Sequence, residues 1–159
     1  MRRTVLLLAA TALAICLSAG VALAYGERGP GVTKTCPTTC TGTTYPDTLI
    51  GTNAPNHIRG LGGNESRTFG DLIQGHGGND TLYGNRGGDR IEGGYGDDTI
   101  YGGLGQNLLI GGPGNDRING GPDSETIRVR DGYRDVVNCG GPNDDISNRD
   151  PGLDVFRNC

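Results

Sequence analysis

The sequence predicts an all-β fold, a right-handed parallel β-roll, and three observations lead to this prediction. A nine-residue unit, G-G-x-G-x-D-x-U-x with U an aliphatic residue, repeats along most of the chain, and residues 93–101 and 111–119 match it in full. The first six places of the unit are rich in Gly, Asp and Asn, which favour turns, and the last three places suit a minimal strand. The aliphatic residue keeps one place in the unit, so one side chain of each strand is expected to point inward.

The repeat extends over nine units from Gly42 to Arg128 and weakens toward both ends. The two units within residues 75–92 depart from the pattern only at the second glycine. Between residues 60 and 74 the unit is longer by six residues. We place this insertion at Glu65–Gly70, directly before the pattern resumes.

Two units make one coil of 18 residues, with two strands and two turns, and stacked coils make the roll. Such a core is small, so the fold needs a further source of stability. The inward ladder is predicted to consist of Leu49, Ile58, Ile73, Leu82, Ile91, Ile100, Leu109, Ile118 and Ile127.

The aspartate in the sixth place of the unit indicates a site for a hard cation. Ca²⁺ takes about six to eight oxygen ligands and tolerates irregular geometry. Glycine lets the turn carbonyls point inward beside the carboxylate. One turn cannot complete such a shell, but two turns stacked on the same edge can share one ion. We therefore predict Ca²⁺ as the cofactor, bound between coils.

The spacing assigns the predicted ligands to two edges. One edge carries Asn56, Asp80, Asp98 and Asp116, and its predicted sites are the pairs Asp80/Asp98 and Asp98/Asp116. The other edge carries Asp47, Asp71, Asp89, Asn107 and Glu125, and its predicted site is Asp71/Asp89. At Asn56, Asn107 and Glu125 the leading interpretation is that calcium affinity has been lost by drift. The turn glycines expected to surround the ions are Gly75, Gly77, Gly93, Gly94, Gly96, Gly111, Gly112 and Gly114.

Residues 1–24 are predicted to be a Sec-type signal peptide, with a charged start, an apolar run too short for a membrane span, and Ala22-Leu23-Ala24 as the cleavage signal. The protein is therefore expected to be secreted and extracellular. The rest of the chain is expected to comprise a lead-in over residues 25–41, the calcium-binding repeats over 42–128 and a degenerate C-terminal cap over 129–159.

Four cysteines lie beyond the predicted signal peptide, an even number that suits an oxidising compartment. They allow three pairings, of which we favour Cys36–Cys40 and Cys139–Cys159, one at each end of the repeats. A zinc site is a weaker alternative, because Cys36 and Cys40 have no second pair at metal spacing and no nearby histidine.

Charge and motifs exclude several classes of function. Without Arg2 and Arg3 the chain has 12 basic and 18 acidic residues, a net charge of −6, which disfavours a nucleic-acid partner. No EF-hand loop, P-loop or serine-triad signature is present. The sequence places no serine or cysteine where it could act as a catalytic nucleophile with His57 or His76. We therefore expect the protein not to be an enzyme.

The nonapeptides resemble the hemolysin-type, or RTX, calcium-binding repeat family, strongly over residues 75–119 and in degraded form over 42–128. The resemblance implies a parallel β-roll with Ca²⁺ between coils. An N-terminal Sec signal departs from the best-known members, which carry a C-terminal export signal. The layout is similar to small secreted repeat proteins of actinobacteria, which share the segment matched by Asp131–Gly140 and a final cysteine. We interpret this tail as degenerate coils, with Asp144 or Asp145 and Asp154 as remnants of the repeat aspartate.

The sequence thus predicts a secreted, non-catalytic calcium-binding protein whose folding is driven by Ca²⁺ between stacked turns. It leaves open the macromolecular partner and whether the protein is a monomer. One alternative is an adhesion or assembly module that docks through an open end of the solenoid. The other is a polysaccharide-modifying enzyme, for which the insertion and Arg59, Arg67 and Arg86 mark the place to look.

Overall fold

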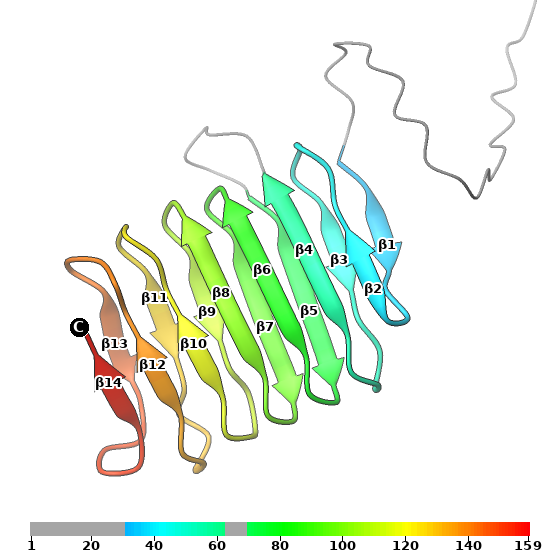
Figure 1. Ribbon diagram of the computed structural model, residues 1–159. Helices are drawn as coiled ribbons and strands as arrows, with labels where there is room; N and C mark the ends of the chain where they lie inside the picture. Colours follow the sequence, from blue (N-terminus) through cyan, green and yellow to red (C-terminus); the bar gives the residue numbers. More distant parts are fainter. Residues whose placement is uncertain (1–30, 63–69) are drawn as a thin grey trace, which may run out of the picture.

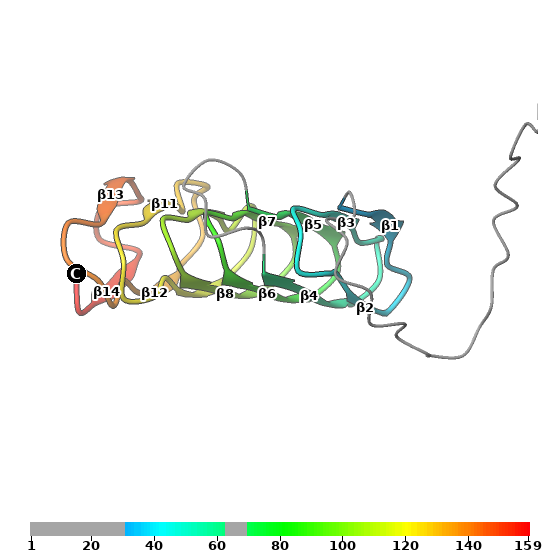
Figure 2. The ribbon, with the colours of Figure 1, turned by 90° about the horizontal axis from the view of Figure 1, so that it is seen from above.

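The protein is described by a computed structural model, which covers residues 31–62 and 70–159. The predicted signal peptide and residues 65–69 of the predicted insertion lie outside the described residues. The described chain forms two seven-stranded sheets, in which every paired strand is parallel to its neighbour. Odd-numbered strands make one sheet and even-numbered strands the other, and the two sheets face each other as the two walls of a flattened coil (Figures 1 and 2). The predicted parallel β-roll is confirmed.

The odd sheet consists of β1 (Thr33–Thr35), β3 (Thr48–Ile50), β5 (Leu72–Gly77), β7 (Arg90–Tyr95), β9 (Leu108–Ile110), β11 (Thr126–Arg128) and β13 (Asp145–Asn148). The even sheet consists of β2 (Thr39–Thr41), β4 (His57–Gly62), β6 (Thr81–Arg86), β8 (Thr99–Leu104), β10 (Arg117–Asn119), β12 (Val136–Asn138) and β14 (Val155–Arg157). Strands therefore continue into both the predicted lead-in and the predicted cap.

The core consists of two rows of aliphatic side chains, one from each sheet, that face each other between the sheets. All nine residues of the predicted inward ladder are at most 2% exposed. The register stacks them directly, so that Ile100 pairs with Leu82 on one side and Ile118 on the other. Cys36, Val129, Val137 and Cys139 extend this core toward the two ends.

The central strands are longer than the unit predicts. β4 to β8 each span six residues, because the first three residues of the following unit also pair with an adjacent coil. Asn85 pairs with Gly103 in this way. The second place of the unit bends the backbone to positive φ even without glycine, and His76 and Asn85 both have a φ of 75°. β9 has only three residues, and the unit after it holds Pro113, which has no N–H to extend the pairing.

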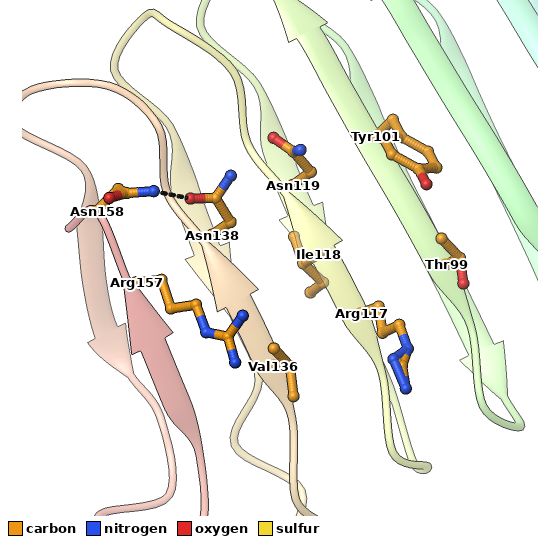
Figure 3. Close-up of a pocket in the computed structure, with 9 residues that line it drawn as sticks. All are labelled: Thr99, Tyr101, Arg117, Ile118, Asn119, Val136, Asn138, Arg157 and Asn158. Carbon is orange, nitrogen blue, oxygen red and sulfur yellow. Dashed lines mark hydrogen bonds between the residues drawn. The ribbon is translucent and has the colours of Figure 1, made fainter.

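The outer face of the even sheet carries a ladder of rings from His57, Tyr83 and Tyr101. The Tyr83 and Tyr101 rings stack with centroids 4.8 Å apart and an angle of 5° between their planes. The next position in register is Asn119. Beside it lies an open cavity of about 430 Å³, whose lining includes Tyr101, Arg117, Asn138 and Arg157 (Figure 3).

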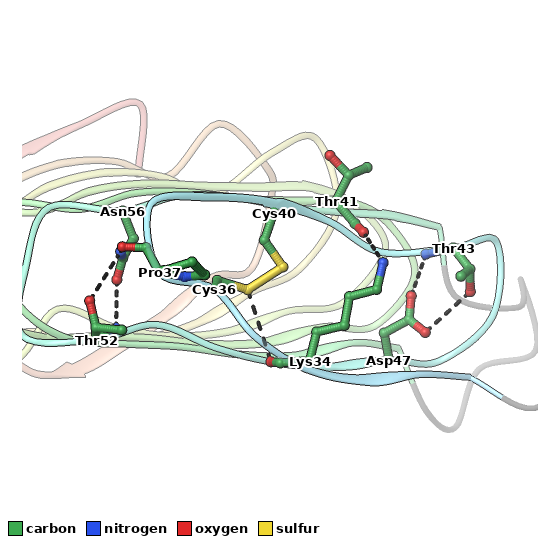
Figure 4. The surroundings of a disulfide bond; sticks show 9 residues. All are labelled: Lys34, Cys36, Pro37, Cys40, Thr41, Thr43, Asp47, Thr52 and Asn56. Carbon is green, nitrogen blue, oxygen red and sulfur yellow. Dashed lines mark hydrogen bonds between the residues drawn. A yellow bond between two sulfur atoms is a disulfide. The ribbon is translucent and has the colours of Figure 1, made fainter. Parts of the chain in front are cut away.

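Both predicted disulfides are present. Cys36–Cys40 joins the end of β1 to β2 within the first described coil (Figure 4), and Cys139–Cys159 joins the segments that follow β12 and β14. Each bond thus constrains an end of the solenoid, where a coil has a neighbour on one side only. Over residues 31–62 and 70–159, no helix has the length and apolar character needed to cross a lipid bilayer.

Candidate metal site

The turns of the roll stack into two rims, and each rim carries a row of carboxylates. We call the turns that lead into even-numbered strands the even rim and those that lead into odd-numbered strands the odd rim. The even rim holds Asn56, Asp80, Asp98 and Asp116, each directly before a strand. The odd rim holds Asp47, Asp71, Asp89, Asn107 and Glu125 in the equivalent place. The fold therefore sorts these residues onto the two edges that their spacing predicted.

Hydrogen bonds connect the residues of the even rim from coil to coil. The backbone N–H of Asp80 donates to Oδ1 of Asp98, and the N–H of Asp98 donates to Oδ1 of Asp116, both at 2.8 Å. The N–H of Asn56 donates to Oδ1 of Asp80 at 2.7 Å. Asp80, Asp98 and Asp116 are thus aligned along one rim, one coil apart.

The odd rim repeats this arrangement. The backbone N–H of Asp47 donates to Oδ1 of Asp71 at 2.8 Å, and the N–H of Asp71 donates to Oδ1 of Asp89 at 2.7 Å. The N–H of Asp89 donates to Oδ1 of Asn107 at 2.9 Å. Six rim residues therefore each commit one side-chain oxygen to the backbone of the preceding coil: Asp71, Asp80, Asp89, Asp98, Asn107 and Asp116.

The second oxygen of these carboxylates has no such role. Oδ2 of Asp71, Asp80, Asp89, Asp98 and Asp116 is buried and has no hydrogen-bond partner among the described residues. A buried carboxylate oxygen without a donor is costly unless a cation compensates it. The second oxygens are therefore the atoms that fit a metal ion.

The first glycine of each unit keeps space open beside this oxygen. A Cβ built on Gly93 would lie 2.2 Å from Oδ2 of Asp98 and 2.6 Å from the carbonyl oxygen of Gly111, one coil further on. At Gly75 the corresponding distances are 2.2 Å to Oδ2 of Asp80 and 2.4 Å to the carbonyl oxygen of Gly93. A carboxylate and a carbonyl from adjacent coils thus converge on one small space, which is the oxygen-only donor set that Ca²⁺ prefers.

The other predicted glycines shape the turns. Gly94, Gly96, Gly112 and Gly114 have positive φ, and a Cβ on any of them would lie 2.0–2.3 Å from the carbonyl oxygen of the turn one coil before. They allow the turns to stack closely. Gly77 is different, because the nearest atom to its Cβ position, Oδ1 of Asn53, is 3.5 Å away.

Burial makes the rim carboxylates hard to ionise without a counter-ion. Desolvation raises the pKa of Asp89 and of Asp98 to about 7, and the neighbouring carboxylates of Asp71 and Asp80, respectively, add to the effect. Desolvation together with Asp135, Asp98 and Asp131 raises the pKa of Asp116 to about 8. Rows of like charge in a buried setting are the electrostatic condition under which a divalent cation binds favourably.

The two asparagines of the rims are satisfied by the protein itself. The side chain of Asn56 accepts a hydrogen bond from the N–H of Thr52 at 2.7 Å and donates to the carbonyl oxygen of Pro37 at 3.1 Å (Figure 4). The side chain of Asn107 donates to the carbonyl oxygen of Gly105 at 3.0 Å. The protein itself therefore satisfies both amides. This fits the interpretation that these two units have lost their calcium affinity by sequence drift.

The even rim continues into the tail through Asp154, which the sequence indicated as a remnant of the repeat aspartate, and through Asp135, which sequence reasoning missed. Oδ1 of Asp135 accepts the N–H of Asp116 at 2.8 Å, and Oδ1 of Asp154 accepts the N–H of Asp135 at 3.1 Å. On the odd rim, Oδ1 of Asp144 accepts the N–H of Glu125 at 2.8 Å, so Asp144 and not Asp145 takes the repeat position. Asp135 was hidden because its coil is one residue longer, although Asp135-Val136-Val137 keeps the D-x-U signal of the unit.

Comparison with known proteins agrees with this geometry. The family model of the RTX calcium-binding nonapeptide repeat matches residues 41–66, 68–91, 74–109 and 92–127. No curated protein and no solved structure gives a significant match. The family model covers more than half of the chain and spans the turns that carry the rim aspartates. The chain therefore belongs to the family of proteins built from RTX calcium-binding nonapeptide repeats.

Proposed function

We propose that the protein is a secreted, non-catalytic calcium-binding module whose roll is held in shape by Ca²⁺ between stacked turns of the same rim. The observation that supports this most directly is the divided use of the carboxylates of Asp71, Asp80, Asp89, Asp98 and Asp116. One oxygen joins two coils by a hydrogen bond, and the other is buried beside a turn carbonyl with no donor of its own. The proposed ligands are Asp80, Asp98 and Asp116 on the even rim and Asp71 and Asp89 on the odd rim.

The small core makes folding dependent on the ion. One aliphatic side chain per strand is buried, whereas the glycines of the turns lose more conformational freedom on folding than other residues. Repulsion among the rim carboxylates opposes folding further until a cation binds. Two disulfides agree with folding in an oxidising, extracellular compartment, where calcium is abundant.

Circular dichroism of the chain from residue 25 onward, with both disulfides formed, tests the proposal. We expect the strand signal to develop as Ca²⁺ is added and to be lost when a chelator removes it. A magnesium titration serves as the control, because Mg²⁺ requires near-octahedral geometry and retains its water. A strand signal that does not change on chelation would contradict the proposal.

One feature favours a second role, as a module that docks an acidic polysaccharide. No described strand of the even sheet contains Asp or Glu, and its outer face carries Arg59, Arg117 and Arg157. The cavity beyond the Tyr101 ring is lined by two of these arginines and by Asn119, Asn138 and Asn158 (Figure 3). Among the described residues no carboxylate lines this cavity, so they supply no acid pair of a glycoside hydrolase there, and the surface fits binding better than cleavage.

Co-sedimentation of the calcium-loaded protein with an insoluble polyuronate tests this second role. We expect Arg117→Gln to weaken the association and Arg90→Gln, on the odd sheet, to leave it unchanged. Equal binding to a neutral glucan would contradict a role for the arginines.

A further inference from the structure

The turn that leads into β12 differs from the other described turns of the even rim because it contains one more residue. Residues 129–135 separate β11 from β12, whereas residues 111–116 separate β9 from β10. This longer turn contains Asp131. One carboxylate oxygen from each of Asp116, Asp131 and Asp135 lies within 4.8 Å of the other two, and no other group of three metal-ligating side chains converges so closely in the described part of the chain.

Backbone hydrogen bonds hold Asp131 in this position. Its N–H and that of Gly132 both donate to Oδ2 of Asp150, at 2.9 and 2.6 Å. Its own Oδ1 accepts the N–H of Tyr133 at 2.8 Å. The remaining oxygen, Oδ2 of Asp131, is buried without a hydrogen-bond donor among the described residues.

Asp116 and Asp135 are buried, and within the described part of the chain each also has one oxygen without a hydrogen-bond donor. Asp135 is fully buried and Asp116 is 1% exposed. Each uses Oδ1 to accept a backbone N–H from the preceding coil, and each has a buried Oδ2 without a donor in the described residues. Each of the three carboxylates thus keeps one buried oxygen without a donor in the described residues, and the three groups lie close together.

We propose that Asp116, Asp131 and Asp135 form a three-carboxylate calcium site that binds Ca²⁺ more tightly than the positions between nonapeptide turns. The nonapeptide spacing supplies two aspartates to a pair of stacked turns, and Asp131 adds a third negative charge that lies outside the repeat pattern. Calcium affinity rises with the number of charged ligands, and this site has one more carboxylate than a pair of stacked nonapeptide turns. The inference rests on the proposed calcium binding of the roll, because Asp116 also belongs to the Asp98/Asp116 position.

Asp131→Asn tests the site with little change of shape. Asparagine keeps the Oδ1 acceptor for the Tyr133 N–H but removes the charge. Asp145→Asn is the matched control, because Oδ1 of Asp145 accepts the N–H of Ser147 at 3.0 Å in the same local geometry, but Asp145 is exposed and outside the rims. By calorimetry we expect Asp131→Asn to weaken the tightest calcium site about tenfold or more, with Asp145→Asn like wild type.

Calcium release after mixing with a chelator separates a ligand from a structural residue. We expect wild type to release one ion in a slow phase, Asp131→Asn to lack this phase, and Asp131→Glu, which keeps the carboxylate, to retain it. If Asp131→Asn binds and releases calcium like wild type, the three-carboxylate site is wrong while the calcium-binding roll stands. If wild type binds no calcium at all, both proposals fail.

A measurement on wild type covers the case in which Asp131→Asn does not fold. Carbodiimide coupling followed by mass spectrometry reports which carboxylates are shielded at one equivalent of Ca²⁺. We expect Asp131 and Asp135 to be protected before Asp80, with Asp145 reactive throughout. Protection that begins at Asp80 would overturn the inference.

Discussion

The backbone N–H of Asp98 donates to Oδ1 of Asp116 across 2.8 Å, although the two residues are 18 positions apart. This bond joins two coils and turns Oδ2 of Asp116 toward the space beside Gly111, whose Cβ position is 2.2 Å from that oxygen. Structural support and ion binding are thus divided between the two oxygens of one carboxylate, and this division yields four predictions.

Asp98→Asn is expected to impair two ion positions at once, because Asp98 belongs to both the Asp80/Asp98 and the Asp98/Asp116 pair. Asparagine keeps the Oδ1 acceptor for the Asp80 N–H but removes the charge. At a calcium concentration 100 times Kd, each lost ion removes about 2.7 kcal/mol from the free energy of unfolding. Calorimetry should count two fewer tightly bound ions than in wild type. The control is the neighbouring Asp97→Asn, whose exposed carboxylate should leave the count unchanged.

Asn107→Asp is expected to create a calcium position on the odd rim. The new carboxylate keeps the acceptor for the Asp89 N–H but loses the hydrogen bond from Nδ2 of Asn107 to the carbonyl oxygen of Gly105. Without calcium the added charge repels Asp89, and with calcium it supplies the missing ligand. Less Ca²⁺ should then be needed for half of the maximal strand signal. An unchanged titration midpoint would count against an ion at this position.

Gly93→Ala is expected to abolish binding at Asp98 and to loosen the roll. The added methyl group would lie 2.2 Å from Oδ2 of Asp98 and 2.6 Å from the carbonyl oxygen of Gly111, so it fills the space assigned to the ion. Gly62→Ala is the control, since the nearest atom to its Cβ position is 3.7 Å away. Calcium titrations followed by circular dichroism should separate the two variants, and similar behaviour would argue against the proposed position.

The calcium-free protein is expected to be more ordered in mild acid than in mild base. Burial raises the pKa of Asp89 and Asp98 to about 7 and that of Asp116 to about 8 in the folded state. Unfolded aspartate has a pKa of about 3.9, so between about pH 4 and 8 the folded state holds protons that the unfolded state has released. The free energy of unfolding therefore falls as the pH rises through this window.

Calcium should reverse this trend, because Ca²⁺ competes with protons for the same oxygens and binds better as they ionise. The measurement is the strand signal at pH 5 and pH 8, with chelator and with saturating calcium. Greater order of the chelated protein at pH 8 than at pH 5 would contradict the assignment of buried carboxylates to the rims.

The repeat alone predicted the parallel roll, the nine inward aliphatic residues and the alignment of Asp80, Asp98 and Asp116. These follow from the period, because two units make a coil and residues 18 positions apart must then stack. The six-residue central strands were not predicted. Their glycine-rich ends pair only when an adjacent coil is in place, so the signal is absent from any single unit.

What the sequence by itself determined about this protein is the order of its parts: which residues face inward, which reach a rim, and which coils are neighbours. Only the tertiary structure decided which oxygens remain for an ion. It satisfied the amides of Asn56 and Asn107 with protein partners, and it brought Asp131 to Asp116 and Asp135 through a turn with one extra residue. It also left Oδ2 of five rim aspartates, Asp71, Asp80, Asp89, Asp98 and Asp116, without a donor among the described residues. The physical reason is that hydrogen-bond satisfaction and carboxylate clustering depend on distances between coils, which a linear period does not specify.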